Sequence, residues 1–328
     1  MKTPTTFKIC LLVLFFAAMA NVDGFAQKGD APTITKTFQT SGPGGLIVES
    51  SGGGVMVEAH DRNEVEVRAF VRYKGMTLAP DDPKLDELKV IIEKRGSEIV
   101  AKVDRKMGSR PWNQLGVSFT VFTSREMSCA LTSNGGGVNV SGVSGTHQFE
   151  SNGGGISLEN ITGSTEAQSA GGGVHVQNQN GNVRLVSNGG GVSLADARGD
   201  IYARSSGGGV MLENVDGQIN ARSSGGAVRI MGVAPSVVAQ SSGGAISMDI
   251  SGLDKELKLE TSGGGIHATI RDGRRLGLDL DLKFQNVNID LDNFSGIAKK
   301  DRVDGTSNGG GIPVYMRTAG GSINVDFQ

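Results

Sequence analysis

The chain has 328 residues, of which 51 are glycine and 8 are proline, and its formal net charge is −2 at pH 7. Proteins that bind nucleic acid usually carry a basic stripe, so this charge balance argues against nucleic acid as a main partner. Glycine is about twice as frequent as in an average protein, but no Gly-x-y period runs through the chain, which excludes a collagen helix. Aromatic residues make up only 5%, which is few for stacking on bases or sugars.

Residues 1–26 are predicted to be a secretory signal peptide. Lys2 and Lys8 form a basic start, and residues 9–20 are an apolar run too short to span a bilayer readily. Gly24 and Ala26 put small residues at positions −3 and −1 of a cleavage before Gln27; an uncleaved anchor is the alternative. We therefore expect an exported protein, in the periplasm, in the outer cell envelope or secreted. No second apolar run of spanning length follows, so no integral membrane span is expected after cleavage.

Cleavage would remove Cys10 and leave Cys129 as the single cysteine. The mature protein is therefore expected to have no internal disulfide, although it is exported, and to depend on packing and backbone pairing for its stability.

Residues 27–130 are expected to form a β-rich capping region that includes a first coil. The motif SSGGGV at residues 50–55 is a corner with alternating strands after it. Asp82 followed by Pro83 predicts the start of a short helix that reaches about Leu88. Residues 88–103 favour a hairpin that turns at Arg95-Gly96 over a longer helix, and residues 116–122 form a further strand. Such a region would cover an end of the molecule that is otherwise open to aggregation.

Residues 131–270 contain a repeat of constant length. The residue after each glycine cluster falls 18 positions after its predecessor, at Val138, Ile156, Val174, Val192, Val210, Val228 and Ile246. The next corner residue, Ile266, follows after 20. An apolar column lies five residues further on, at Val143, Ile161, Gln179, Ala197, Val215 and Val233. A serine column precedes the glycines, at Ser133, Ser151, Ser169, Ser187, Ser205, Ser223 and Ser241.

Each copy contains two short runs in which apolar and polar residues alternate, which is typical of β-strands. Such short runs cannot bury a face alone, but stacked copies can. The sequence therefore predicts an all-β fold, a single-stranded β-solenoid with 18-residue coils. Right-handed coils are favoured because parallel crossovers have that hand. The glycines would permit positive φ and close approach of neighbouring coils, and the serines would form a stacked hydroxyl ladder that Thr261 and Ser307 continue.

Two other solenoids also have 18 residues per coil. A calcium β-roll requires an aspartate, but Leu or Val occupies that position here. A left-handed hexapeptide helix would have three equivalent sides, whereas these copies have two unequal halves.

Residues 271–328 are expected to form a C-terminal hairpin and a final coil. Residues 276–284 and 287–294 alternate strictly, and NGGGIPV with AGGSINV closes the chain. In a hairpin, four aspartates could share one face: Asp279, Asp281, Asp290 and Asp292. Clustered carboxylates can bind Ca²⁺, so these are the weak metal candidates; the alternative is a charged face that protects an edge strand.

No catalytic or cofactor-binding residues are predicted. None of the histidines, His60, His147, His175 and His267, has metal-ligand spacing to another His or Cys. His175 and His267 should face outward, whereas His147 and Cys129 fall in an inward column, and Cys129 should be a buried, inert thiol. The outward columns are mixed: one contains Arg184, Tyr202 and Asn220, and another contains Arg204, Arg222 and Gln240. No acidic or aromatic stripe marks a polysaccharide lyase.

The signal peptide, the glycine-rich opening at residues 44–69, the S-[NS]-G-G-[GA]-[VI] repeats and the ending at residues 307–328 together resemble a bacterial family of exported domains of unknown function, the putative adhesins. The resemblance implies a β-helical fold and a cell-envelope location, and no site residues. The function expected is a non-enzymatic adhesin or envelope scaffold that binds an unknown protein or glycan. A carbohydrate-active β-helix enzyme and a periplasmic accessory of envelope-stress signalling are the alternatives.

Overall fold

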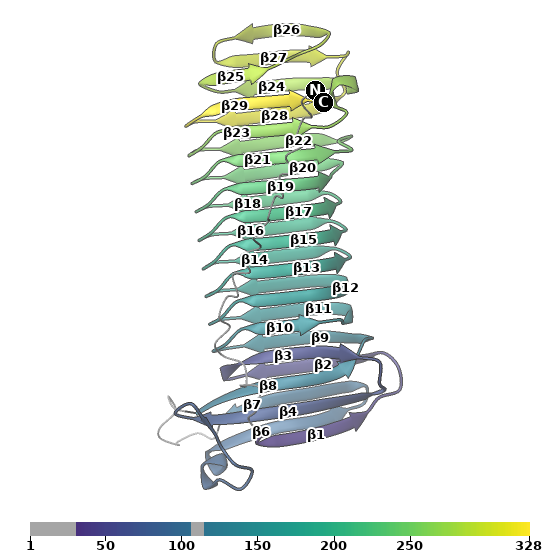
Figure 1. The fold of residues 1–328 in the computed structure, drawn as a ribbon, viewed down its shortest axis with the longest axis vertical. Coiled ribbons are helices and arrows are strands. Elements are labelled where there is room, and N and C mark those ends of the chain that lie inside the picture. Colours follow the sequence, from purple (N-terminus) through teal and green to yellow (C-terminus); the bar gives the residue numbers. More distant parts are fainter. Residues whose placement is uncertain (1–30, 106–114) are drawn as a thin grey trace, which may run out of the picture.

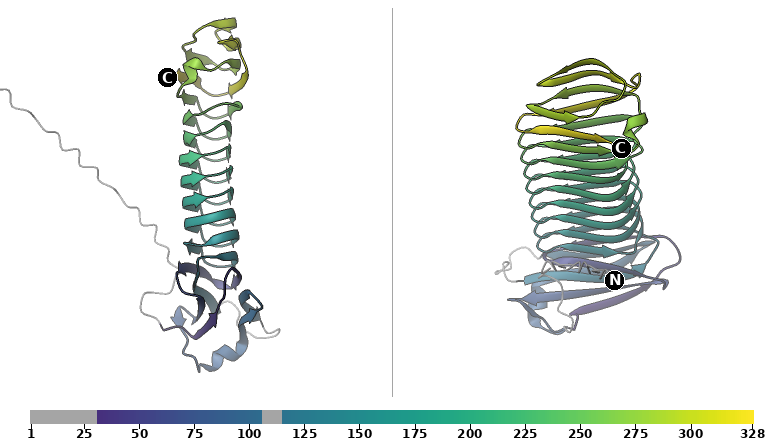
Figure 2. Two further views of the ribbon diagram at one scale, coloured as in Figure 1. Left: turned by 90° about the vertical axis from the view of Figure 1, so that its right-hand side faces the viewer. Right: turned by 45° about the horizontal axis from the view of Figure 1, so that its top comes forward.

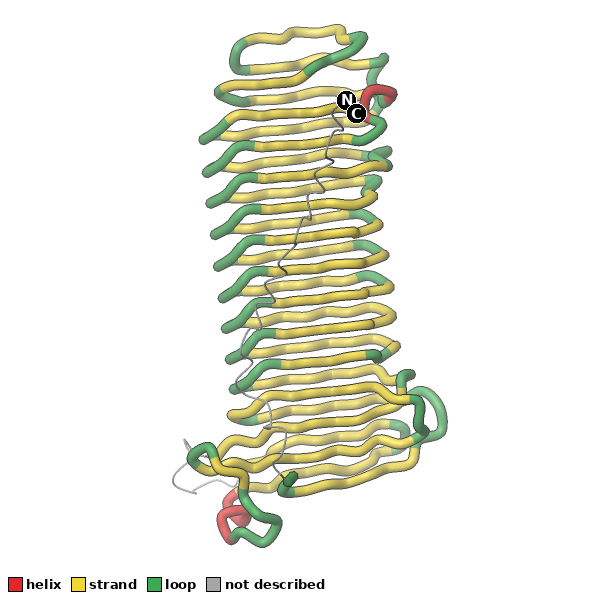
Figure 3. Tube along the Cα trace, viewed as in Figure 1, coloured by secondary structure: helices red, strands yellow, loops and turns green. Residues whose placement is uncertain are grey.

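The computed structural model describes residues 31–105 and 115–328 and shows an all-β solenoid (Figure 1). The predicted signal peptide lies outside the described residues. Each regular coil contributes one strand to each of two parallel ladders, which face each other across a thin core (Figure 2). The turns between them stack along the two edges of the molecule (Figure 3).

We call one ladder the serine sheet, because its strands end at the serine column. It contains β9 (Met127–Ser133), β11 (Ser144–Ser151), the second half of β12 (Ile156–Ser169), β14 (Val183–Ser187), β16 (Ile201–Ser205), β18 (Ile219–Ser223), β20 (Ser236–Ser241) and β22 (Glu256–Thr261).

We call the other ladder the valine sheet, because its strands begin after the glycines. It contains β10 (Val138–Ser141), the first half of β12, β13 (Val174–Asn180), β15 (Val192–Arg198), β17 (Val210–Asp216), β19 (Val228–Val233), β21 (Ile246–Ser251) and β23 (Ile266–Ile270). Residues 18 apart pair directly, as Val174 does with Val192. The predicted repeat of 18 residues therefore corresponds to one complete coil.

The predicted inward columns form the core, with one exception. Val215 is 1% exposed, whereas Val233 is 46% exposed. The register between β17 and β19 shifts after Leu212, so that Gly232 pairs with Val215 and takes the inward position. The shift arises because this coil has no counterpart of Asn214, a left-handed turn residue with φ 52°. The offset between paired residues returns to 18 within the same coil, after Pro235, where Val237 pairs with Ile219.

The corner glycines are required for close approach, and the part of the prediction that invoked positive φ is wrong for them. None of the corner triplets between residues 135 and 265, all of which are described, is among the residues with positive φ. A Cβ on Gly208 would lie 2.6 Å from the backbone nitrogen of Gly191, a separation that real side chains do not show. Left-handed backbone occurs instead at the opposite edge, where Gly181 and Gly199 have φ of 127° and 125°.

The serines hold the glycine corners by bonds to backbone atoms, not by a hydroxyl-to-hydroxyl ladder. The hydroxyl of Ser169 lies 2.9 Å from the carbonyl oxygens of both Gly154 and Gly172, and it accepts from the amide of Gly172 at 3.1 Å. Each serine therefore links its own corner to that of the preceding coil. Thr261 continues the column, but the next member is Thr318, which pairs with Thr261, and not Ser307.

The first coil consists of β2 (Gly44–Ser50) and β3 (Gly52–His60), and the N-terminal cap adds two levels to the ladder of β2 and three to the ladder of β3. β7 (Glu98–Arg105) pairs in parallel with β2, and β8 (Leu115–Ser124) pairs in parallel with β3. The outermost strands are antiparallel: β6 (Leu88–Arg95) pairs with β7, β4 (Glu64–Tyr73) with β8 and with β5 (Met76–Thr77), and β1 (Ile34–Gln39) with β4. The hairpin turning at Arg95-Gly96 is therefore confirmed, and the longer helix is not formed. The helix predicted at Asp82 is the 3₁₀ helix η1 (Pro83–Glu87), and Asp82 accepts from the amide of Lys84.

Lysine side chains protect the edges of this cap. The ammonium of Lys36 on β1 donates to the carbonyl oxygen of Ile92 on β6 at 2.8 Å, and Lys94 on β6 donates to the carbonyl oxygen of Gln39 at 2.6 Å. The two edge strands thus occupy each other's exposed backbone groups, which is one way to prevent pairing with another chain.

The C-terminal region differs from the expected hairpin. β24 (Leu278–Lys283) and β25 (Asn286–Ile289) belong to different ladders and form a coil of their own. Above it lies the antiparallel pair of β26 (Phe294–Lys299) and β27 (Arg302–Ser307), with β27 also antiparallel to β24.

The last two strands then return down the stack. β28 (Ile312–Thr318) pairs with β22 and β24, and β29 (Ser322–Phe327) pairs with β23 and β25 (Figure 1). The final coil of the sequence is therefore not the final coil in space.

Candidate functional site

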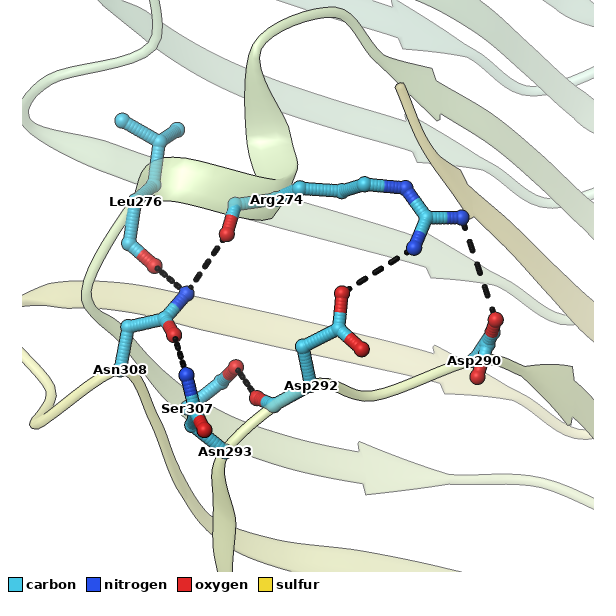
Figure 4. A network of polar contacts seen from close by, with 7 residues as sticks. All are labelled: Arg274, Leu276, Asp290, Asp292, Asn293, Ser307 and Asn308. Carbon is cyan, nitrogen blue, oxygen red and sulfur yellow. Dashed lines mark hydrogen bonds and ion pairs between the residues drawn. The ribbon is translucent and has the colours of Figure 1, made fainter.

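The four aspartates considered for calcium do not share one face, because β24 and β25 do not form a hairpin. Asp279 accepts from the backbone amide of Gly311 at 3.2 Å, and Asp281 lies 3.4 Å from the ammonium of Lys283. Asp290 and Asp292, which follow β25, lie 3.8 Å and 3.0 Å from the guanidinium of Arg274 (Figure 4). The aspartates thus stabilise the C-terminal region through backbone and cation contacts, and the predicted shared calcium face is wrong.

Titratable side chains elsewhere do not converge on a metal site. In the described ranges 31–105 and 115–328, no three His, Cys, Asp or Glu side chains are grouped so that they could bind a metal ion. His175 and His267 are exposed, as their columns predict. Cys129 is buried, and this burial raises the pKa of its thiol to about 12, so the group stays protonated and is a poor nucleophile at neutral pH.

His147 is the one histidine placed in a core column, and the structure buries it to 2% exposure. Its Nε2 lies 3.2 Å from the carbonyl oxygen of Thr162, its ring stacks on Phe149, and its Nδ1 has no partner. Burial lowers the pKa of the imidazole, and the contact with the Thr162 carbonyl offsets this only in part. His147 is therefore a neutral core residue without access to a ligand.

A long recess follows the glycine corners along the stack. We call it the corner groove; its volume is about 1190 Å³. Its floor is the backbone of the glycine triplets from Gly135 to Gly209, where no side chain fills the space. One wall is the first outward column of the valine sheet: Asn139, Ser157, His175, Ser193, Met211 and Arg229.

The chemistry of the corner groove changes along its length. Small polar groups line it at Asn139, Ser157 and Ser193, whereas Met211 is 43% exposed and Arg229 adds a cation beyond it. An extended ligand would therefore meet a polar stretch and then an apolar and a positive group.

A second, shallower recess lies on the serine sheet, at the start of its strands. We call it the serine-sheet groove; its volume is about 370 Å³. The guanidinium of Arg184 lies 4.2 Å from the ring centroid of Tyr202 and 3.3 Å from a carboxylate oxygen of Glu166. The stacked pair occupies one face of the tyrosine ring, and Asn220 on the next strand is directly beside it.

Sequence reasoning identified part of these surfaces. The alternation predicts that the column of Arg184, Tyr202 and Asn220 faces outward, and this column lines the serine-sheet groove. The corner groove was missed, although its signal is present: three consecutive residues without side chains leave a recess wherever their corners stack.

A scan against models of protein families finds no match, and no curated protein matches the chain. Two solved structures are similar over most of the chain. One is a putative cell adhesion protein from Clostridium sporogenes, with 8% identity and a TM-score of 0.23, covering 91% of this chain and 100% of that one. The other is a putative adhesin from Bacteroides fragilis, with 11% identity and a TM-score of 0.29, covering 89% and 96%.

A search of the described residues for a helix long and apolar enough to cross a bilayer finds none.

Proposed function

We propose that the protein is a non-enzymatic, exported β-solenoid that binds an extended ligand at the bacterial cell envelope, as an adhesin or a scaffold. The corner groove is the observation that supports this function best. It extends over successive coils from Gly135 to Arg229, and stacked repeats typically bind ligands along such extended surfaces. The ligand class is a protein or a glycan of the envelope.

The rigidity of the groove favours binding. Its floor consists of backbone that the serine column holds at each corner, as Ser187 does with the carbonyl oxygens of Gly172 and Gly190 at 2.9 Å and 2.8 Å. A surface that does not reorganise on binding loses less conformational entropy, so more of the contact free energy appears as affinity.

The experiment is a glycan array and a pull-down from envelope extract, with wild-type protein and two tryptophan variants. Ser193→Trp places a large side chain in the corner groove, whereas Val186→Trp places one on the outward face of the serine sheet, and both positions are half-buried. We expect Ser193→Trp to lose the captured ligand and Val186→Trp to retain it. Equal loss in both variants would contradict binding in the corner groove.

A polysaccharide-cleavage screen tests the enzymatic alternative on the same preparation. We expect no turnover. Release of oligosaccharides from any polysaccharide would overturn the proposal that the protein is not an enzyme.

A further inference from the structure

The coil formed by β28 and β29 fills a slot between strands that precede it in the sequence. Val314 pairs with Leu257 below and Leu280 above, and Ile323 pairs with Ile266 below and Val287 above. Without this coil, the stack would have two unpaired strand edges facing each other: the edge of β22 and β23, and the edge of β24 and β25. Their unpaired backbone groups specify an incoming coil in one register.

The inserted coil is a full member of the core. Val314 is 1% exposed, and Met316 and Ile323 are fully buried. Thr318 continues the corner column, donating to the carbonyl oxygen of Gly264 at 2.6 Å. The coil and its slot are therefore complementary over both ladders, and that complementarity is a property of the sequence, whichever molecule supplies the coil.

The segment that connects β27 to this coil has an unusual backbone conformation. β27 lies on one side of β24 and β28 on the other, so residues 308–311 must carry the chain around the end of β24. All four have positive φ: Asn308 at 49°, Gly309 at 84°, Gly310 at 76° and Gly311 at 136°. Three consecutive glycines also adopt extended backbone readily, so the same segment can serve as a hinge.

Polar contacts of Asn308 hold this hinge in the left-handed conformation that turns the chain around the end of β24. The amide nitrogen of the Asn308 side chain donates to the carbonyl oxygens of Arg274 and Leu276 at 2.8 Å and 3.1 Å, and its oxygen accepts from Asn293 at 2.9 Å (Figure 4). Arg274 also binds Asp292. These contacts lie at the exposed corner of the stack, whereas the coil beyond the hinge is buried.

We propose that this C-terminal coil, residues 312–327, is exchangeable between two copies of the chain, so that each copy fills the slot of the other in a reciprocal dimer. Exchange recreates every strand pairing and every buried contact of the coil, because the two copies are identical. The free-energy difference between monomer and dimer therefore resides in the hinge and in the cost of association. This inference is independent of the ligand of the corner groove.

The test is a disulfide that reports which chain fills the slot. Lys258 on β22 and Tyr315 on β28 are register partners on the outward face, so the double variant Lys258→Cys, Tyr315→Cys can be oxidised across the slot. The control is Tyr202→Cys, Asn220→Cys, a register pair in the same outward column on β16 and β18, where exchange of the C-terminal coil changes nothing. Cys129 is buried and does not interfere.

Both proteins are unfolded, refolded over a range of concentrations, oxidised and separated on a non-reducing gel. While most of the protein is monomeric, a tenfold higher refolding concentration should raise the ratio of covalent dimer to monomer about tenfold for the slot pair by mass action, and the control pair should stay monomeric. Intrachain disulfide alone at every concentration would overturn the proposal.

A second variant tests the hinge directly. Removing Gly309 and Gly310 in the slot-pair background leaves too few residues to pass around β24, so the protein should become a covalent dimer even at low concentration. A folded monomer with an intrachain disulfide would overturn the proposal, and if this deletion does not fold, the concentration series decides.

Discussion

Single polar residues interrupt the apolar core in the first regular coils. Gln179 is 2% exposed; its amide nitrogen donates to the carbonyl oxygen of Gly163 at 2.8 Å, and its oxygen accepts from the hydroxyl of Thr165 at 3.3 Å. His147, on the adjacent strand to Thr165, satisfies only one of its two ring nitrogens. Gln179 is therefore compatible with the core, whereas His147 makes it sensitive to protonation.

The stability of the protein should fall when His147 is forced to accept a proton. Because burial lowers its pKa in the folded state below the ordinary value of 6.5, the unfolded chain binds the proton more readily. The contribution of neutral His147 is complete above pH 6.5 and is lost progressively as the pH falls below it. Urea unfolding at pH 7.5 and pH 5.5 should show the lower free energy of unfolding at pH 5.5.

The variant His147→Thr, which places the residue of the next coil in this column, should reduce that difference between the two pH values. His175→Gln removes an exposed histidine and should leave the difference unchanged. An equal pH dependence in wild type and His147→Thr would contradict the assignment.

Cys129 should resist thiol reagents in the folded protein. Its thiol is 2% exposed, and its pKa is raised to about 12, so little thiolate forms at pH 8. We expect labelling of the native protein to be at least about a hundredfold slower than that of the urea-unfolded protein, since it requires opening of the core. Rapid modification of the native protein, followed by mass spectrometry, would show that the column does not face inward.

The glycine corner is the element on which the stack depends, and its three positions are not equivalent. The middle glycine is enclosed: a Cβ on Gly208 would meet three backbone atoms of the preceding coil within 3.0 Å. A Cβ on the third glycine, Gly209, would meet one carbonyl oxygen at 2.7 Å, with the next atom at 3.5 Å. Two coils already have alanine at that third position, Ala227 and Ala245.

Gly208→Ala should therefore destabilise the protein by about 2–3 kcal/mol, the usual cost of forcing atoms into a closely packed site. Gly209→Ala should cost less than about 1 kcal/mol, because the neighbouring coils tolerate the same methyl group. Chemical denaturation of both variants measures the difference. If the two variants were equally stable, close approach would not be the reason for the middle glycine.

Over the whole molecule, each regular coil contacts only its neighbours, so stability is approximately a sum of coil and interface contributions. Deleting residues 207–224 removes one coil and joins Ser206 to Gly225, which recreates a corner of the same sequence type. This variant should fold, be shorter by about 4.8 Å and keep most of the thermal stability. Circular dichroism and thermal melts test it.

The matched control is the deletion of residues 207–215, half of the same coil. It places a strand where a corner must form and moves every following strand to the opposite ladder, so that glycine corners no longer stack on glycine corners; it should melt far lower or fail to fold. Equal tolerance of the two deletions would contradict the stacked-coil architecture.

The amino-acid sequence by itself determined the coil. The spacing of Val174, Val192 and Val210 sets the period, and alternation within each copy sets which side chains face inward, because a strand places successive side chains on opposite faces. Copies in constant register leave one consistent stacking. The outward column at Tyr202 followed from the same rule, and so did the burial of Cys129 and His147.

The tertiary structure decided what repetition could not. Residues 276–284, 287–294 and 312–327 all alternate as strands, but alternation identifies a strand and not its partner. Which edge each one joins depends on the connection lengths and on the edges left open by the rest of the chain. The apparent corner at residues 307–312 thus became a left-handed hinge, the aspartates separated, and the last coil of the sequence entered the stack below an earlier one. The corner groove likewise exists only because successive coils place their bare glycines in one line.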